Sequence, residues 1–473
     1  APTATPTPAP TATPTPAPTA TPTPAPTATP TPALVSGASY VAPTGNDANS
    51  GTASSPWATL QKAANSLPAN GTVYVRAGTY TGFTMSRSGL SSTSPTSFLA
   101  YPGDPRPVIA ANGRVDVIKF SANHDVVVRG FVIQGAAGGN GSGAGIRIEN
   151  GAYRITIKNN LIQNNRSYGV NINNSTEVVI DGNEVTRNEE GIYVSRLGAG
   201  VRIVNNLVHH QDKMVVNTSG IANDDHGAVG IALVRTTGAI YVGSNQIWSN
   251  RAASYDYAWD GGAFEIYSAS NVTMAYNVTW DNENVLETGS DGTLGCGNNV
   301  FRHNVSYGAT SQGRSFGMFL RCAYNMTVAN NVFHNLDQFV FSVKSGNGLW
   351  DGSIEGLRIQ NNIAVMATGK IIGIESTLPA SVSIDRNLFD NTSGGYLASV
   401  VGKGSTNSLA TFTSWTGQMG TGIDANPMFT NPSVRDYHVQ PGSPVIDRGV
   451  VLFGTSVPII GSAPDIGRYD TAP

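Results

Sequence analysis

Short stretches in which apolar and polar residues alternate recur along most of the chain. Examples are GVNIN from Gly169, GIYVS from Gly191, GIALV from Gly230 and GMFLR from Gly317. Alternation with a period of two turns one side chain inward and the next outward, as in a β-strand with one buried face. Because no helical pattern separates these stretches, the sequence predicts short strands joined directly by turns.

Each repeated phrase runs from an alternating stretch into Asn, followed by an apolar pair and a second polar residue. The key residues are Asn160, Asn183, Asn206, Asn245, Asn277, Asn304, Asn331, Asn362 and Asn387. Their intervals are 23, 23, 39, 32, 27, 27, 31 and 25 residues. A minimum near 23 with insertions is the length of one coil, so two or three strands per turn predict a solenoid of β-coils.

The repeats between residues 116 and 395 resemble those of the right-handed parallel β-helix family, the pectate-lyase-like superfamily. The resemblance implies an all-β fold, a right-handed parallel β-helix solenoid. It also accounts for the asparagines, because an amide at the same turn of every rung can bond the rungs above and below at about 4.8 Å. We therefore expect these Asn residues to be structural.

Four segments are expected along the chain. Residues 1–34 begin with four copies of APTATPTP, in which proline removes backbone donors, so we expect a disordered linker that attaches the protein to a cell surface or another module. Residues 36–115 resemble the N-terminal cap and first coils of secreted β-helix proteins, with a capping helix from Trp57 to Leu67. Residues 116–395 form the remaining coils, and residues 396–473 form the C-terminal coils and closing cap.

Charge and hydropathy exclude several functional classes. A net charge of -3 with only 12% charged residues supplies no basic surface for phosphates, so no nucleic-acid partner is expected. The sequence contains no apolar run of about 18 residues that would span a membrane. The Thr/Pro-rich linker, the few lysines and a cysteine pair indicate a secreted or cell-surface protein, which we expect to be a monomer.

The two cysteines, Cys296 and Cys322, lie 26 residues apart, close to the local coil length of 27. They should therefore sit on adjacent rungs, where Cα atoms are about 4.8 Å apart, inside the range that a disulfide requires. We expect a disulfide, the alternative being two buried thiols.

The candidate catalytic residues are Glu265, Glu287 and Asp260. If Phe264 points inward, Glu265 and Tyr267 point outward, and the equivalent register in the next rung turns Glu287 outward beside Glu265. A shift of one residue would bury either carboxylate.

Two insertions, residues 211–227 and 251–262, enter the same face and should wall a groove. The first carries Asp225 and His226, and the second carries Trp259 and Asp260. Carboxylates and aromatic rings suit sugar binding, so we expect Trp259, Tyr267, His226 and Asp225 to contact substrate. Arg321 and Lys344, further along the same face, are also expected to bind it. His226 serves equally well as a residue that orders the loop, and Asp225 as a turn cap.

These features favour a secreted enzyme that cleaves a polysaccharide, most simply a glycoside hydrolase, which needs one protonated and one ionised carboxyl group and no cofactor. Outward Glu265 and Glu287 match the spacing of retaining enzymes, and a pair with Asp260 matches the inverting spacing.

Two alternatives remain open. A polysaccharide lyase or epimerase acting on a uronic-acid polymer would use Arg321 or Lys344 as base, with Ca²⁺ as a cofactor. This alternative follows from the resemblance to β-helix lyases. The second is a non-catalytic glycan-binding or adhesin β-helix. The sequence identifies neither the sugar nor a metal requirement.

Overall fold

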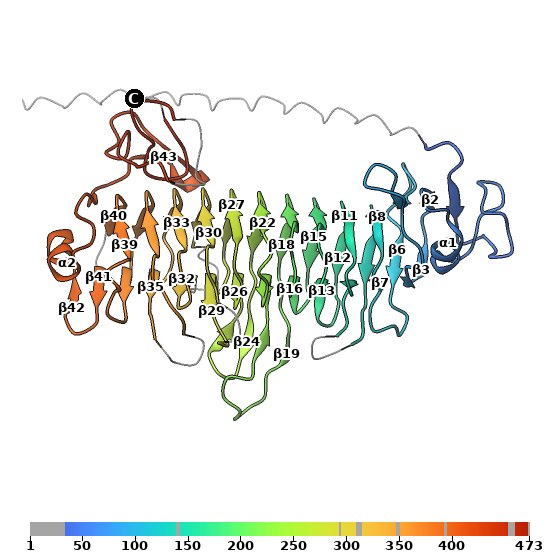
Figure 1. The fold of residues 1–473 in the computed structure, drawn as a ribbon, viewed down its shortest axis with the longest axis horizontal. Coiled ribbons are helices and arrows are strands. Elements are labelled where there is room, and N and C mark those ends of the chain that lie inside the picture. The colour runs from blue at the N-terminus through green and yellow to red at the C-terminus, as the bar shows by residue number, and fades with distance from the viewer. Residues whose placement is uncertain are drawn as a thin grey trace, which may run out of the picture. The chain divides into compact units, whose positions relative to one another are not determined.

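The computed structural model describes residues 34–138, 142–292, 295–308, 315–346, 351–391, 395–452 and 459–471. The predicted linker therefore lies outside the described residues, apart from Leu34. Within residues 35–473, which form one compact unit, the described chain is almost entirely β-structure, in three long sheets of short strands (Figure 1).

The first sheet has 13 described strands, all parallel. In spatial order they are β1 (Ser39–Val41), β2 (Thr72–Val75), β5 (Thr96–Ala100), β8 (His124–Arg129), β11 (Tyr153–Lys158), β14 (Val179–Asp181), β17 (Arg202–Val204), β22 (Ile240–Gly243), β27 (Val272–Ala275), β30 (Val300–Arg302), β33 (Thr327–Ala329), β36 (Arg358–Gln360) and β39 (Ser383–Asp385).

The second sheet also has 13 described strands, and the last, β42, runs antiparallel to β41. In spatial order they are β4 (Phe83–Thr84), β7 (Ile118–Ser121), β10 (Ile146–Glu149), β13 (Tyr168–Asn173), β16 (Glu190–Ser195), β21 (Val229–Val234), β26 (Gly262–Tyr267), β29 (Asn284–Gly289), β32 (Phe316–Leu320), β35 (Phe339–Val343), β38 (Lys370–Ile374), β41 (Tyr396–Val400) and β42 (Gly404–Thr406).

The third sheet has 12 described parallel strands. In spatial order they are β3 (Thr79–Thr81), β6 (Val108–Ala110), β9 (Val132–Gln134), β12 (Leu161–Gln163), β15 (Glu184–Thr186), β18 (Leu207–His209), β23 (Gln246–Trp248), β28 (Val278–Trp280), β31 (Val305–Tyr307), β34 (Val332–His334), β37 (Ile363–Met366) and β40 (Leu388–Asn391). Each turn of the chain contributes one strand to each sheet, which confirms the predicted β-helix.

The core consists of inward side chains that stack from rung to rung. Ile192 and Val194 on β16, for example, lie in register with Ile231 and Leu233 on β21, and all four side chains are at most 1% exposed. Each fully buried aliphatic side chain contributes about 1.5–3 kcal/mol. The alternation predicted from the sequence therefore places one continuous apolar column inside the three sheets.

The predicted asparagines form a continuous ladder at one turn of the coil. The side-chain amide of Asn160 donates to Asn183 at 3.0 Å, Asn183 donates to Asn206 at 3.1 Å, and the series continues to Asn387. The same amides also satisfy backbone carbonyls of the preceding rung. These residues are structural, as the sequence predicted.

A second ladder at another turn was not predicted. It consists of Asn165, Asn188, Gln211, Asn250 and Asn282, joined by side-chain and backbone hydrogen bonds of 2.8–3.2 Å. Because a Gln occupies one rung, this position of the coil does not repeat a single residue type, and the ladder could not be recognised as an Asn repeat in the sequence.

A short helix precedes the coils. Helix α1 (Leu60–Ser66) begins three residues later than the predicted Trp57 start, because Thr59 is its N-cap and accepts a hydrogen bond from the Lys62 N–H. The Asp47 carboxylate binds the N–H groups of Ala58 and Thr59 in an extended segment before the helix. The capping helix is therefore confirmed with a shorter N-terminal end.

The C-terminal segment closes the other end. Helix α2 (Leu409–Thr416) ends at Gly417, which adopts a left-handed conformation with φ 70°. The hairpin of β43 (Phe429–Asn431), 3-10 helix η1 (Pro432–Val434) and β44 (Asp436–Val439) then packs its apolar residues against the third sheet. Figure 1 shows α1 and α2 at opposite ends of the stack of strands.

The predicted disulfide is confirmed. Cys296 and Cys322 are bonded, and their Cα atoms are 5.7 Å apart. The neighbouring residues Gly297 and Tyr324 form a parallel bridge between adjacent rungs. None of the helices in the described part of the chain is long and apolar enough to cross a membrane.

Candidate active site

Two carboxylates stand side by side on the outer face of the second sheet. Glu265 on β26 and Glu287 on β29 are register partners in neighbouring parallel strands. Their flanking residues, such as Phe264 and Leu286, are buried, while both carboxylates remain partly exposed. The predicted register is therefore confirmed, and strand spacing brings the two side chains to within about 5 Å of each other at their bases.

The surroundings of these carboxylates favour their protonated forms. Burial raises the pKa of Glu287 to about 7; the charges on Glu265 and Asp260 act in the same direction, and Arg321 opposes them. Burial also raises the pKa of Glu265, whereas His226 lowers it. Near neutral pH the site can therefore hold a proton on one carboxylate and a charge on the other.

His226 is held between two buried carboxylates. Its Nδ1 lies 3.1 Å from Glu189 Oε1 and its Nε2 lies 3.1 Å from Glu190 Oε1. An imidazolium ring donates from both nitrogens and would satisfy both contacts at once. The charge on Glu190 is the main cause that raises the pKa of His226, to about 10, and burial raises the pKa of Glu190 to about 8.

Glu189 and Glu190 were missed in the sequence analysis. Their side chains are 0% and 2% exposed, although charged side chains are rarely buried without a partner. The signal was the pair of adjacent glutamates directly before the apolar strand GIYVS. Their partner His226 follows 36 residues later, so only the fold brings the three together.

The two predicted insertions are antiparallel hairpins, which project together from the middle of the stack (Figure 1). β19 (Met214–Val216) pairs with β20 (His226–Gly227), and β24 (Ala252–Ser254) pairs with β25 (Ala258–Asp260). Asn217 in the first hairpin donates to the Ala253 carbonyl in the second at 2.8 Å. The hairpins thus form one wall, and β20 and β25 lead directly into the neighbouring strands β21 and β26.

The second hairpin brings Asp260 to the carboxylate pair. Burial raises the pKa of Asp260 to about 7, opposed by the Gly261 N–H, which donates to its Oδ1 at 2.7 Å. The charges of Asp225 and Glu265 raise this pKa further. Trp259, which precedes Asp260, is 40% exposed. The structure thus places Asp260 among the acidic groups of the site and leaves Trp259 open to solvent.

Asp225 belongs to a separate acidic cluster within the hairpins. Asp224, Asp225 and Asp256 each bring a carboxylate oxygen to within 4.8 Å of the others. Ser254 Oγ donates to Asp225 Oδ2, while Asp225 Oδ1 is buried without a hydrogen-bond partner among the described residues. Burial and the contact with Asp256 raise the pKa of Asp225. A set of hard oxygen donors with one unsatisfied atom fits a cation such as Ca²⁺.

The basic candidates Arg321 and Lys344 are both paired with one buried carboxylate. Lys344 Nζ lies 2.7 Å and Arg321 Nη1 3.5 Å from Asp351, whose side chain is 2% exposed. Tyr267 lies on β26 two residues beyond Glu265, where burial and the charge on Asp291 raise the pKa of its hydroxyl to about 12. Arg321 also acts on Glu287, so it borders the carboxylate pair.

The chain matches the family model described as Pel9A-like, right-handed beta helix region, over residues 39–313. It belongs to this family. The match covers more than half of the sequence and includes the coils that carry Glu190, His226, Glu265 and Glu287.

Solved structures share the fold of this Pel9A-like chain. The complex of XylC with xylose superimposes with a TM-score of 0.55 at 12% identity, covering 83% of this chain and 87% of that one. Pectate lyase Pel9A superimposes with a TM-score of 0.52 at 15% identity, covering 92% and 96%. An uncharacterised protein of Bacillus subtilis (strain 168), YwoF, is 28% identical over 131 residues, which are 26% of this chain and 28% of that protein.

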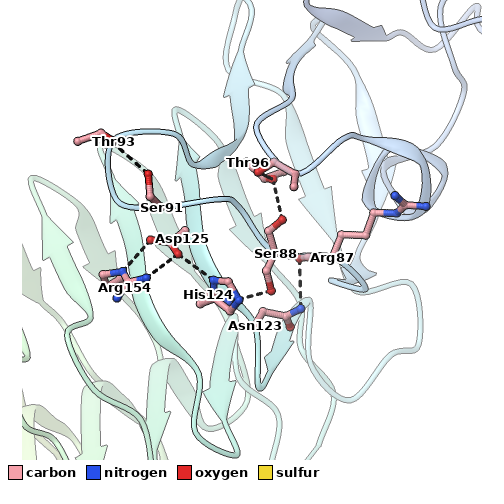
Figure 2. Close-up of polar contacts among 10 residues, drawn as sticks. Arg87, Ser88, Ser91, Thr93, Thr96, Asn123, His124, Asp125 and Arg154 are labelled. Carbon is pink, nitrogen blue, oxygen red and sulfur yellow. Dashed lines mark hydrogen bonds and ion pairs between the residues drawn. The ribbon is translucent and has the colours of Figure 1, made fainter.

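A serine, a histidine and an aspartate meet elsewhere in this Pel9A-like chain, at the N-terminal end of the first sheet (Figure 2). His124 Nδ1 lies 2.8 Å from Asp125 Oδ2, and Arg154 binds both oxygens of Asp125. Ser88 Oγ, however, accepts from the backbone N–H of His124 at 3.1 Å. A nucleophilic serine must instead give its proton to the ring, so these contacts serve to attach the Ser88 loop to β8.

Proposed function

We propose that this protein is a secreted carbohydrate-active enzyme that hydrolyses a polysaccharide in the groove beside the two hairpins. The observation that carries the proposal is the register of Glu265 and Glu287, two partly exposed carboxylates on adjacent rungs. Carboxyl groups about 5–5.5 Å apart are typical of retaining glycoside hydrolases. The spacing of parallel strands supports that distance.

The charges around the pair support a division of roles. Glu287, with a pKa of about 7, is the general acid and donates its proton to the oxygen of the scissile glycosidic bond. Burial raises the pKa of Glu265, and the charge on His226 opposes this rise; in the proposed mechanism Glu265 is the ionised carboxylate that attacks the anomeric carbon and forms a covalent glycosyl ester. Water then attacks the anomeric carbon, Glu287 takes a proton from it, and the ester bond to Glu265 breaks, so one water is consumed per glycosidic bond and both residues are regenerated.

The relatives support a carbohydrate substrate. One solved structure with this fold is a complex with xylose and another is a pectate lyase. The Cys296–Cys322 disulfide is consistent with an oxidising, extracellular environment. Exposed Trp259, Tyr257 and Tyr255 on the second hairpin offer ring faces on which sugars stack.

A lyase acting on a uronic-acid polymer is the second candidate, favoured by membership of the Pel9A-like family. In this case Arg321 or Lys344 would remove the proton beside the uronate carboxyl group. Asp224, Asp225 and Asp256 would hold a Ca²⁺ that neutralises the substrate carboxylate. The short Lys344–Asp351 ion pair weakens this alternative, because a paired ammonium is a poor base.

One screen distinguishes the candidates. Polysaccharides are incubated with the protein while reducing ends and the ultraviolet absorbance of unsaturated uronate are both recorded. The hydrolase proposal expects reducing ends without absorbance, loss of activity in Glu265→Gln and Glu287→Gln, and full activity in the exposed control Glu355→Gln. Absorbance that disappears in Arg321→Ala or Lys344→Ala would instead establish the lyase. Binding without either product would establish a non-catalytic glycan-binding protein.

A further inference from the structure

A polar cavity of about 500 Å³ lies between the third sheet and the C-terminal segment. Its floor comes from β37 and β40, including Val365 and Asp390, and the segment around β43 supplies the opposite wall, including Phe429. Asn335 and Asn426 are exposed and lie at its rim. The proposed catalytic carboxylates, Glu265 and Glu287, are on the second sheet, so this cavity is a separate site.

Asp390 is the unusual group in this cavity. Asp390 is 8% exposed, and its Oδ2 has no hydrogen-bond partner among the described residues. A buried carboxylate without a partner costs free energy, so such a group is normally satisfied by a ligand, an ion or ordered water. Burial, followed by the charge on Asp424, raises the pKa of Asp390, which is consistent with a carboxylate that lacks donors.

The described lining provides acceptors and amides but no cationic side chain. The remaining titratable group, His334, is half-buried, and burial lowers its pKa, so it is neutral at physiological pH. An anionic ligand would meet the negative field of Asp390 and Asp424 without compensation. An anionic occupant is therefore disfavoured, and an occupant that donates hydrogen bonds to Asp390 is favoured.

We propose that this cavity is a second carbohydrate site that binds one neutral pentose or hexose unit through its hydroxyl groups. Its volume lies within the range of about 300–1,000 Å³ found for small-molecule sites. Asp390 accepts from sugar hydroxyls, Asn335 and Asn426 bind further hydroxyls at the rim, and Phe429 and Val365 contact the apolar C–H face. The choice of a sugar over another polyol rests on the proposed function. The existence of a binding site here rests on the cavity and on Asp390, and does not depend on that function.

The methyl group of Met428 provides a local probe, because Met428 lines the cavity and is 37% exposed. In protein labelled with ¹³C at the methionine methyls, eight signals are expected, and Met428→Leu assigns the one required. D-xylose, D-glucose and D-galactose are titrated separately, with D-galacturonate as the anionic comparison. The proposal expects a saturable shift of the Met428 signal with at least one neutral sugar and at least tenfold weaker binding of galacturonate.

Variants define the site. Asp390→Ala should weaken binding of the sugar by at least tenfold, and Asn335→Trp, which fills the mouth from an exposed position, should do the same. Because Asn335 has a φ of 50°, where a bulky residue is strained, the thermal melt of this variant is first matched to that of the parent protein. Glu355→Gln, which removes one exposed charge elsewhere, and Glu287→Gln, which disables the proposed hydrolase, should leave the Met428 titration unchanged.

Three results would overturn the proposal. In the first, the Met428 signal responds to none of the neutral sugars. In the second, sugar shifts this signal equally in the parent protein and in Asn335→Trp. In the third, the signal responds to Ca²⁺ and not to sugar. Because the readout needs no turnover, a protein that binds sugar here but hydrolyses nothing would refute only the hydrolase.

Discussion

Replacing Glu190 with Gln should lower the pKa of His226. Glu190 Oε1 lies 3.1 Å from His226 Nε2, and Gln keeps an oxygen at this position while removing the negative charge. Glu190, with a pKa of about 8, is ionised before His226, with a pKa of about 10, loses its proton. The full charge of Glu190 therefore acts on His226 at the midpoint of its titration.

The size of the change follows from this distance. Two unit charges separated by 3.1 Å interact by about 5 kcal/mol at an effective dielectric constant of about 20, and by about 1.3 kcal/mol in bulk water. These values correspond to about 4 and about 1 pH units. Because the side chain of His226 is 45% exposed, solvent screens the pair, and we expect a decrease of about 1 to 2 pH units.

The assay is an NMR titration of the histidine ring signals. The chain has seven histidines, and His226→Asn assigns the relevant signal by its loss. Glu184→Gln is the matched control, because Glu184 lies 3.4 Å from His209 and outside the carboxylate groove. This variant should change the titration of His209 and of its neighbour His210, whose Nδ1 lies 2.8 Å from His209 Nδ1, and leave that of His226 unchanged. The pairing of a charged His226 ring with Glu190 is wrong if His226 of the parent protein titrates near its ordinary pKa of about 6.5. It is also wrong if Glu190→Gln leaves the midpoint of the His226 titration unchanged.

Three further predictions concern the groove and the coil. Hydrolytic activity should fall as pH rises above about 7, since the proposed general acid Glu287 must be protonated and burial raises its pKa to about 7; a profile that keeps rising to pH 9 would contradict the proposed role. The Cys296–Cys322 disulfide joins residues 26 positions apart, and its reduction should lower the free energy of unfolding by about 3 kcal/mol. Chemical denaturation of the oxidised protein and of the reduced, alkylated protein measures this difference. Asn206→Ala should cost about 3 kcal/mol in the same assay, because its amide bonds Asn245 and backbone carbonyls at 2.9–3.0 Å and these buried acceptors lose donors; a loss below 1 kcal/mol would show that the ladder relaxes.

The backbone geometry of the site could be predicted because it depends on local pattern. Phe264, Ile266 and Leu286 are apolar at alternating positions, and a one-residue slip would expose all of them, so the sequence allowed one register. The same argument placed Cys296 and Cys322 on adjacent rungs. Coil length and period-two alternation are properties of short segments, so they can be recognised in the sequence without knowledge of the rest of the fold.

The electrostatic partners could not be predicted from these local patterns. Glu190 and His226 meet because the β19–β20 hairpin folds back over the start of β16, where the Ala228 N–H donates to the Glu189 carbonyl at 2.7 Å. The position of a hairpin tip depends on contacts between insertions, such as that of Asn217 with Ala253. Those contacts have no period in the sequence, so the insertions that wall the groove could be predicted, but not the pairing of His226 with Glu189 and Glu190.

The parallel rungs and the two inserted hairpins contribute different properties to the candidate site. Parallel strands keep a nearly constant spacing whatever their outward side chains are, so the rungs set the distance between Glu265 and Glu287. They cannot make these residues different, because both occupy the same position of the repeat. Burial raises the pKa of both residues, and the insertions make their surroundings different: His226 on one insertion opposes the rise for Glu265, whereas Asp260 on the other adds to the rise for Glu287. A repeat that places two like groups side by side becomes an acid and a nucleophile only when insertions break its symmetry, so exchanging the hairpins between related β-helices should change the pH dependence of hydrolysis before it changes the distance between the carboxylates.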